Sequence, residues 1–447
     1  MAALTLRSVK GSELTAAEID ANFTNLNNDK LDKSASTNIG IAGTQGFGVG
    51  LCKNLPSGFS KMTGTDDTAS ANYGNYQYTD GSVMCWVPAF YYKIGTGSNG
   101  LALNAVDIKD YSYYADVATA NVAGYALHRA FYNAGVVQTG VFVDKYQCSN
   151  NGGIASSIKL GNPLSSSLVH NPFSGLTGLT TGDNILGGAF KAAKTRGVKF
   201  FCNSRFIFSA LALLSLAHAQ AATSTTACAW YHAAGITNFP KGNNNNALKD
   251  INDATVTYIT DGYSNCGQTG SASNLAKTAH NGQSCGVVDL NGNLWEINTG
   301  IVSNGTNYYL LKTSVDINAL TGSNTLSTDA WGAASIAANY DLLGATYGAL
   351  TASSTAKTWG AATQVFDGAT SGTAWSATGS GIPLLTGIGG TNQMGNDALY
   401  DYRPNDMCAG AGGGWAVGAD AGVWALYLYS DRTSSYGAFG FRSALYL

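Results

Sequence analysis

The chain has 447 residues, a formal net charge of −3 and only 11% charged residues, against about 25% in ordinary globular proteins. No cluster of Lys and Arg is present to neutralise phosphates, which excludes nucleic-acid binding through a basic surface. The 56 glycines, together with 45% hydrophobic and 11% aromatic residues, predict a folded, loop-rich, β-leaning protein with a surface of Ser, Thr, Asn and Gly.

The first 40 residues differ in character from the rest. Thr15 and Glu18 form a T-x-x-E capping box at the start of a predicted helix. Ile19, Phe23 and Leu26 follow at helical spacing and give one narrow apolar stripe. A helix of this length is marginal alone in water, so the stripe requires a partner, either the body of the protein or copies of itself in a small coiled coil.

Strands and short helices follow a predicted linker. The Gly/Ser/Thr-rich residues 34–50 predict the linker, and apolar runs at 82–94 and 136–148 predict strands. The segment "GGAFKAAKTRG" at 187–197 predicts a short helix that ends at its last glycine. The apolar run 206–222 has the composition of a signal peptide, but its place in the chain and its interrupting polar residues favour a buried core helix.

The second half of the chain is rich in small polar residues. "KGNNNNALKD" at 241–250 predicts a polar surface loop, and residues 285–300 predict a hairpin with its turn at Asn291-Gly292. The Ala/Ser/Thr/Gly-rich stretch at about 313–385 predicts an irregular insertion.

Each motif for catalysis or metal binding that was considered is incomplete in this sequence. None of the eight cysteines forms a C-x-x-C pair, and the five histidines show no ligand spacing, so the cysteines are expected to be mostly small buried hydrophobes. "GTGSNG" at 95–100 lacks the helix and acidic residue of a nucleotide loop, which favours a hairpin turn. The Asp289, Asn291, Asn293 series lacks the Gly and Glu of a calcium loop. We expect no catalytic residue, no metal site and no cofactor; a pair of carboxylates for glycoside chemistry is left open by the sequence.

Four segments in order resemble proteins related to formylglycine-generating enzymes. "GVFVDKYQCS" (140–149) resembles their opening strand, and residues 189–217 resemble their helix, Arg and second-helix block. "DLNGNLWEINTG" (289–300) resembles their G-N-x-W-E hairpin, and "GGGW" and "GFR" follow near the end. The resemblance implies an α+β, loop-rich, C-type-lectin-like fold in its formylglycine-generating-enzyme variant. Those enzymes use a cysteine pair near the C-terminal end of the fold, whereas this chain has only Cys408 after Cys285, which argues against an oxidase.

The stretch from "GGGW" to "GFR" is more similar to the variable proteins of diversity-generating retroelements, of the phage major tropism determinant type. Those systems randomise adenines in Asn codons and leave NNC codons at exposed positions. The resemblance implies twelve variable, ligand-binding positions, all with residue types that NNC encodes: Gly414, Ala416, Val417, Gly418, Asp420, Tyr427, Tyr429, Ser430, Ser434, Tyr436, Ala438 and Phe439.

The expected organisation follows from these similarities. A helical attachment or trimerisation segment occupies 1–40, a linker and small β region 41–74, and the C-type-lectin-like domain 75–447, with the insertion at 313–385 and a variable region at about 408–447.

The expected role is that of a phage tail fibre or tip protein. "SELTAAEIDANFTNLN" near the N-terminus resembles the start of phage tail proteins. The resemblance implies a homotrimeric receptor-binding protein for host attachment, located in the virion after assembly in the host bacterial cytoplasm. Its partners would be a bacterial surface receptor, protein or glycan, and other tail proteins through the N-terminus, with no nucleic acid and no membrane insertion. Two alternatives stay open: an enzyme on the same fold (a degenerate oxidase or a glycan hydrolase), and a cell-surface variable protein without a phage.

The composition of the C-terminal segment also favours binding. Tyrosines among Gly, Ala and Ser supply rigid contact area with little loss of entropy. In a strand, Tyr427 and Tyr429 share a face, and Leu426 and Leu428 point the other way. The alternative is that these aromatics pack a β core, in which each buried Tyr hydroxyl needs a partner. The scaffold is expected to include Trp295, Trp415, Trp424 and Arg442.

Overall fold

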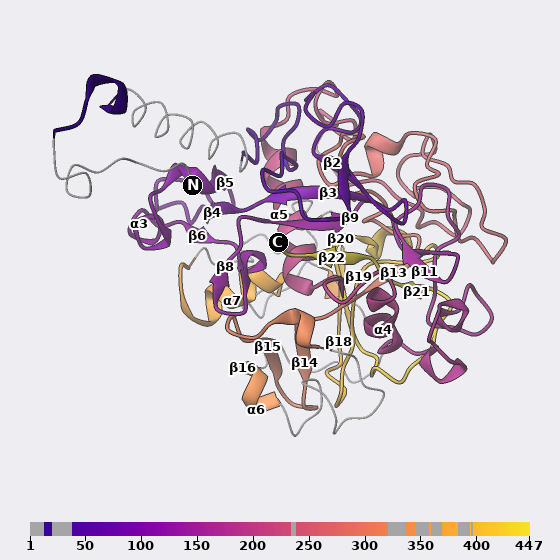
Figure 1. Ribbon diagram of the computed structural model, residues 1–447. Helices are drawn as coiled ribbons and strands as arrows, with labels where there is room; N and C mark the ends of the chain where they lie inside the picture. Colours follow the sequence, from indigo (N-terminus) through magenta and orange to yellow (C-terminus); the bar gives the residue numbers. More distant parts are fainter. Residues whose placement is uncertain are drawn as a thin grey trace.

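The computed structural model describes residues 13–19, 38–233, 238–320, 336–344, 357–358, 369–382, 394 and 397–447. Within these residues, strands in several sheets are joined by long loops and a few helices (Figure 1). The chain is therefore loop-rich, as its composition predicts, and mixed α and β, as the family resemblance implies.

The first large sheet joins strands from both ends of the sequence. Its order is β1 (Phe59–Lys61), β2 (Asn75–Tyr78), β3 (Val83–Pro88), β9 (Gly140–Asp144), β22 (Ser443–Leu445) and β12 (Phe201–Cys202), all antiparallel. Strands β3 and β9 confirm the two apolar runs predicted as strands. Trp86 and Phe142 face each other across their pairing and pack at 4.8 Å between ring centroids on one side of the sheet.

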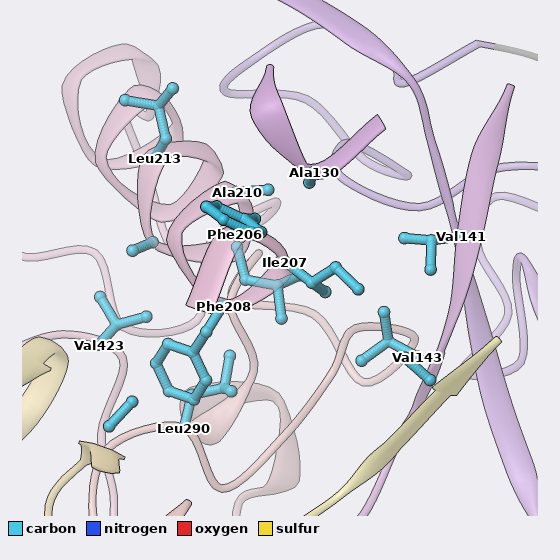
Figure 2. Packing of buried hydrophobic residues seen from close by; sticks show 14 of the residues in the cluster. Ala130, Val141, Val143, Phe206, Ile207, Phe208, Ala210, Leu213, Leu290 and Val423 are labelled. Carbon is cyan, nitrogen blue, oxygen red and sulfur yellow. The ribbon is translucent and has the colours of Figure 1, made fainter. Parts of the chain in front are cut away.

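Helix α5 (Arg205–Ala221) packs against the other side of this sheet. Ser204 caps it by accepting a hydrogen bond from the Ile207 backbone N–H at 3.1 Å, and residues 205–218 are all buried. Figure 2 shows Ile207 beside Val143 of β9, and Phe208 beside Leu290. The predicted buried core helix is confirmed. Among the residues placed by the structure, no helix combines the length and apolar character needed to cross a membrane.

The second large sheet carries the C-terminal segment. Its order is β17 (Lys357–Thr358), β18 (Ala398–Asp401), β20 (Gly422–Leu428), β19 (Ala409–Gly412), β13 (Trp295–Asn298) and β21 (Phe439–Gly440). The pairs β18–β20 and β13–β21 are parallel, and the other pairs are antiparallel. Strands β19 and β20 contact α5, so this one helix lies against both large sheets.

Smaller elements cover the edges. Three-stranded sheets are formed by β4 (Phe90–Ile94), β5 (Val106–Asp110) and β6 (Ala126–Leu127), and by β14 (Ile301–Ser303), β15 (Tyr308–Leu311) and β16 (Tyr340–Gly344). Two-stranded pairs are β7 (Tyr132–Asn133) with β8 (Val136–Val137), and β10 (Ser149–Asn151) with β11 (Ile154–Ser156). Further α-helices in the described part of the chain are α3 (Val117–Val122), α4 (Gly188–Lys194), α6 (Ile336–Asn339) and α7 (Gly372–Ser380).

Three further predictions agree with these elements. "GTGSNG" lies in the connection of the antiparallel pair β4–β5, so the hairpin-turn prediction is confirmed. Helix α4 confirms the predicted short helix, with Gly197 beyond its end at φ 146°. At the N-terminus, the Thr15 N–H and hydroxyl both donate to Glu18 Oε2 at 2.8 Å, which confirms the capping box. Phe23 and Leu26 lie outside the described residues, as does most of the predicted insertion.

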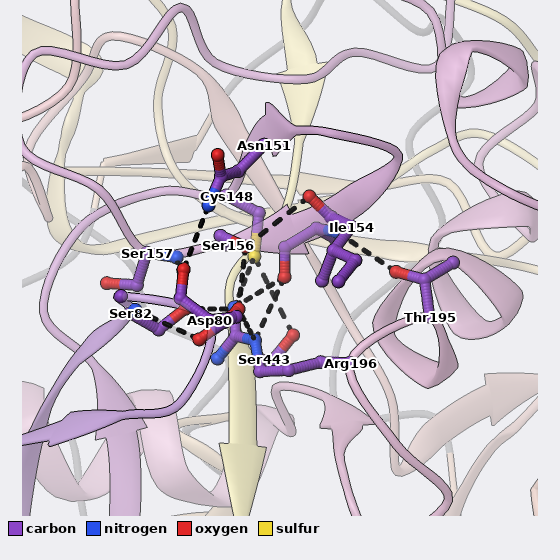
Figure 3. Close-up of polar contacts among 12 residues, drawn as sticks. Asp80, Ser82, Cys148, Asn151, Ile154, Ser156, Ser157, Thr195, Arg196 and Ser443 are labelled. Atoms are coloured by element: carbon purple, nitrogen blue, oxygen red, sulfur yellow. Dashed lines mark hydrogen bonds and ion pairs between the residues drawn. The ribbon is translucent and has the colours of Figure 1, made fainter.

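Two buried ion pairs lie beside strand β22, and one of them joins the two large sheets. Arg196 Nη1 lies 2.5 Å from Asp144 Oδ1, and the same carboxylate accepts from the Ser443 backbone N–H at 2.8 Å. Figure 3 shows Arg196 close to Ser443 and to Asp80, whose Oδ2 lies 3.3 Å from Arg196 Nε. Arg442 pairs with Glu296 through two contacts and also donates to the Asp144 carbonyl at 2.9 Å. Both arginine side chains are fully buried, and such charges are tolerated inside a protein only when paired.

The predicted linker at 34–50 is wrong for residues 38–50. Ile39, Phe47 and Val49 are fully buried in the main core. The Phe47 carbonyl accepts from the Asn281 amide at 2.8 Å, which fixes the segment to a distant loop. Its glycines adopt positive φ in successive turns that direct the three apolar side chains inward, so their role is conformational.

The predicted surface loop at 241–250 is wrong for residues 242–244, which are buried, and right for Asn246 and Ala247, which are exposed. The predicted hairpin at 285–300 is wrong, and both errors have one shared reason. The two segments pack backbone against backbone: a Cβ on Gly292 would lie 2.2 Å from the Asn243 carbonyl oxygen. Asn243 and Asn244 are fully buried, and their amides donate to Asn293 at 3.0 Å and Asn291 at 3.1 Å. The Asn-Gly sequence therefore permits a close approach between segments, and β13 pairs with β19 and β21 instead of with residues 287–290.

Candidate binding face

The end of strand β20 and the residue that follows it alternate between buried leucines and partly exposed tyrosines. Leu426 and Leu428 are fully buried, whereas Tyr427 and Tyr429 keep part of their surface in solvent. The prediction that the two tyrosines share a face and the leucines point inward is therefore confirmed. The cause is the two-residue period of a strand with one side against the core.

Aromatic side chains from neighbouring strands surround Tyr427. Tyr400 of β18 stands in register with it at 5.5 Å between ring centroids, Phe439 of β21 lies at 5.1 Å and Trp295 of β13 at 5.3 Å. Gly410 is opposite Tyr427 on β19, and a Cβ there would lie 2.8 Å from the Phe439 ring. Because Gly410 has no side chain, the Phe439 ring can pack over β19 against Tyr427.

We call this surface the aromatic face. Its members are Trp295, Tyr400, Tyr402, Tyr427, Tyr429, Tyr436 and Phe439. Trp295 and Phe439 are 5% exposed and form its floor, while Tyr402 and Tyr436 are 43% and 39% exposed and form its rim.

Serine hydroxyls link the tyrosines and hold their backbone. Ser430 Oγ lies 3.3 Å from the Tyr427 hydroxyl and 3.3 Å from that of Tyr436. The Tyr436 N–H donates to Ser166 Oγ at 3.0 Å, and that hydroxyl donates to the Tyr436 carbonyl at 3.0 Å. Burial raises the pKa of Tyr427 to about 12, so its phenol stays neutral and can both donate and accept at neutral pH.

The structure brings together five of the twelve predicted positions through direct contacts: Tyr427, Tyr429, Ser430, Tyr436 and Phe439. Gly414 and Ala438 meet beside Trp295, where a Cβ on Gly414 would lie 3.4 Å from Trp295 and 3.7 Å from Ala438.

The other five predicted positions lie beside this group or in its support. Ala416, Val417, Gly418 and Asp420 occupy the turn before β20, where the Gly418 N–H donates to the Asn244 carbonyl at 2.6 Å. Ser434 lies in the loop before Tyr436, and its N–H donates to Asp431 at 3.0 Å. A ligand-binding role for the twelve positions stays a prediction.

Sequence reasoning missed Tyr400 and Tyr402. A partial signal was present, because "LYDY" (399–402) has two tyrosines at i and i+2, the spacing of Tyr427 and Tyr429, although Asp401 stands where the later pair has Leu428. The residues expected in the scaffold are all at most 8% exposed: Trp295, Trp415, Trp424 and Arg442. Trp295 also forms part of the floor of the face.

Beside the aromatic face lies a group of three potential metal ligands, His170, Asp261 and Cys266. Their ligand atoms all lie within 4.8 Å of one another. Separations of about ninety residues between His170 and the other two hide this group from any search for ligand spacing in the sequence.

No family model and no curated protein matches the chain. Among solved structures, the chain is similar to the Major Tropism Determinant P3c variant, with 12% identity, a TM-score of 0.28, and coverage of 82% of this chain and 63% of that one. The Major Tropism Determinant U1 variant is similar at 11% identity, with the same TM-score and coverage. The chain thus spans 63% of the length of these proteins, and the similarity is distant.

Proposed function

We propose that this chain is a receptor-binding protein that presents the aromatic face to a ligand on a bacterial surface. The observation that carries the proposal is the cluster of partly exposed tyrosines on paired strands, with Trp295 and Phe439 beneath them. A contact of this kind depends on shape and aromatic area, which suits a chain with only 11% charged residues.

The rigidity of the face supports binding over simple core packing. Tyr400 and Tyr427 stand on strands held by ladder hydrogen bonds, and Tyr436 is held through Ser166. A face that is ordered before contact loses little conformational entropy when it binds, which improves affinity. The half-exposed hydroxyls can donate to and accept from a glycan or a protein backbone.

The biological setting of the proposal comes from the sequence similarities. From these resemblances we propose a phage tail fibre or tip protein, on a C-type-lectin-like fold, with diversification at the twelve NNC-compatible positions. Residues 1–40 would join three copies and attach them to other tail proteins, so that several weak contacts act together through avidity. A near-copy of the final codons beside a reverse-transcriptase gene is expected in the neighbouring DNA.

The test replaces Tyr427, Tyr429 and Tyr436 together with Ala. Central aromatic contacts typically contribute 1 kcal/mol or more each, so host adsorption is expected to fall about 100-fold or more. Tyr113→Ala is the matched control, since this tyrosine is 63% exposed and belongs to a different part of the fold. Unchanged adsorption by a folded triple variant would rule out the aromatic face as the binding surface. Co-purification with tail particles separates a virion protein from a cell-surface protein.

A further inference from the structure

Three chemically reactive side chains, from the loop of His170 and the turn that holds Asp261 and Cys266, meet behind the loop that carries Tyr436. His170 Nε2 lies 2.5 Å from Asp261 Oδ2, and Cys266 Sγ lies within 4.8 Å of both. The side chains of His170 and Asp261 are 1% and 0% exposed, and Cys266 is fully buried. The fold therefore removes an imidazole, a carboxylate and a thiol from water at one point.

The hydrogen bond of His170 Nδ1 shows which ring nitrogen carries the hydrogen, and therefore what must lie between Nε2 and Asp261. His170 Nδ1 lies 2.6 Å from the Gly437 carbonyl oxygen, which can only accept, so Nδ1 carries the hydrogen. Nε2 then faces a carboxylate oxygen, which in its ionised form also only accepts. A separation of 2.5 Å between two acceptors requires a proton between them, and a metal ion can replace that proton if the two groups move apart.

The carboxylate is already oriented for such a role. Asp261 Oδ1 accepts from the Tyr263 N–H at 2.8 Å, and Oδ2 accepts from the Asn171 amide at 3.1 Å. A histidine whose far nitrogen donates to a backbone carbonyl is the usual arrangement around a bound metal, because that bond fixes the tautomer and the ring orientation.

We propose that His170, Asp261 and Cys266 bind one divalent metal ion of the zinc class. Imidazole nitrogen, carboxylate oxygen and thiolate sulfur are the three ligand types that zinc takes, and a thiolate disfavours calcium and magnesium. Three protein ligands leave a fourth position for water. Ligand atoms around a tetrahedral zinc lie about 3.3–3.7 Å apart, so His170 and Asp261 would separate by about 1 Å on binding. Binding displaces two protons, one from the Cys266 thiol and one from between His170 and Asp261.

The position of the site gives the metal a role beside the aromatic face. The His170 ring stacks on Tyr263 at 4.2 Å and meets the edge of Trp415 at 5.9 Å. Gly437, whose carbonyl the ring binds, lies between Tyr436 and Ala438. The ion would therefore fix the loop of the rim tyrosine. Metal binding itself goes beyond the proposed function and does not depend on it.

The experiment uses the full chain, purified without a histidine tag, under reducing conditions, and titrated with Co²⁺. We expect one Co²⁺ per chain, with a thiolate-to-cobalt charge-transfer band in the near ultraviolet that Zn²⁺ abolishes by displacement. The melting temperature should rise on addition of Zn²⁺, because the ion binds the folded state. Cys266→Ser should lose the band and the bound metal, whereas Cys52→Ser, which alters a buried cysteine in another cluster, should keep both.

Asp261→Asn is the second variant, since its Oδ1 can still accept from Tyr263 while a ligand is lost. It should fold and bind cobalt more weakly than the wild type. The proposal is overturned if the folded wild-type chain takes up no Co²⁺ and is not stabilised by Zn²⁺, because a proton alone then joins His170 and Asp261. It is equally overturned if the charge-transfer band survives in Cys266→Ser.

Discussion

Gly410 sets the depth of the aromatic face, and Gly410→Ala tests that role. A Cβ at this position would lie 2.8 Å from Phe439 Cε1, below the 3.4 Å at which ordinary contacts begin. The Phe439 ring must therefore retreat by about 0.6 Å. It has little room to do so, because Trp295, Tyr427 and Tyr436 surround it at 5.1–6.0 Å between centroids.

The magnitude follows from comparison with Gly414→Ala. A Cβ on Gly414 makes an ordinary contact, 3.4 Å from Trp295 Cδ1. Neither glycine has a positive φ, so both variants gain about 0.4–1 kcal/mol from the reduced freedom of the unfolded chain. Overpacking costs about 1–3 kcal/mol and applies only at Gly410. Gly410→Ala should therefore be less stable than Gly414→Ala by about 1–3 kcal/mol.

The assay is thermal unfolding of both variants and the wild type, with near-ultraviolet circular dichroism as the report on aromatic packing. The unfolding entropy is about 2.1 cal/mol/K per residue, so one kcal/mol corresponds to about 1 °C in Tm for a chain of 447 residues. The Tm of Gly410→Ala is therefore expected to lie about 1–3 °C below that of Gly414→Ala. The aromatic spectrum should change for Gly410→Ala and stay unchanged for Gly414→Ala. Equal Tm values with identical spectra would refute the claim that Gly410 makes room for Phe439.

Three further outcomes follow from buried groups. Burial, with the nearby charges of Arg129 and Arg205, lowers the pKa of His128 to about 3. As the pH falls below about 6.5, the histidine of the unfolded chain is protonated first, which stabilises the unfolded state. Between pH 7 and pH 5 the free energy of unfolding of the wild type, measured with urea, should therefore fall by about 2 kcal/mol more than that of His128→Asn. This control keeps an acceptor for the Ala130 N–H. Arg442→Met leaves the Glu296 carboxylate, whose side chain is 1% exposed, without its cation. The free energy of unfolding measured with urea should fall by about 3–5 kcal/mol, and by less in Arg442→Lys. All eight cysteines are buried, so an aromatic disulfide reagent at pH 8 should label them slowly in the native chain and rapidly in denaturant; rapid native labelling would contradict that burial.

The parts of the fold that the sequence predicts are those governed by local physics. Helix α5 follows from an apolar run behind a serine cap, and the inward leucines of β20 follow from the two-residue period. Gly and Asn are typical of exposed loops, and this composition hides the burial of residues 38–50 and 242–244. Their burial depends on partners far along the chain, such as Asn281 for the Phe47 carbonyl.

The same limit applies to the aromatic face. Tyr427, Tyr429 and Tyr436 could be predicted because they share one segment, whereas Tyr400 reaches the face through a parallel pairing between β18 and β20. Trp295 was assigned only to the scaffold, since nothing in its own hairpin-like motif indicates that Phe439 pairs beside it. Convergence of separate strands on one surface is a property of the sheet and is absent from any local pattern.

Strand β22 lies in the interior of the first sheet, between β9 and β12, and bonds to residues synthesised 299 positions earlier. During translation that sheet stays open until residues 443–445 have emerged, and β9 then presents an unpaired edge. A frameshift or stop codon introduced anywhere between the two strands yields a chain that lacks this interior strand. A chain that closes the sheet must therefore have been translated in frame through residues 414–439. Folding thus selects for an intact reading frame in the segment proposed to vary.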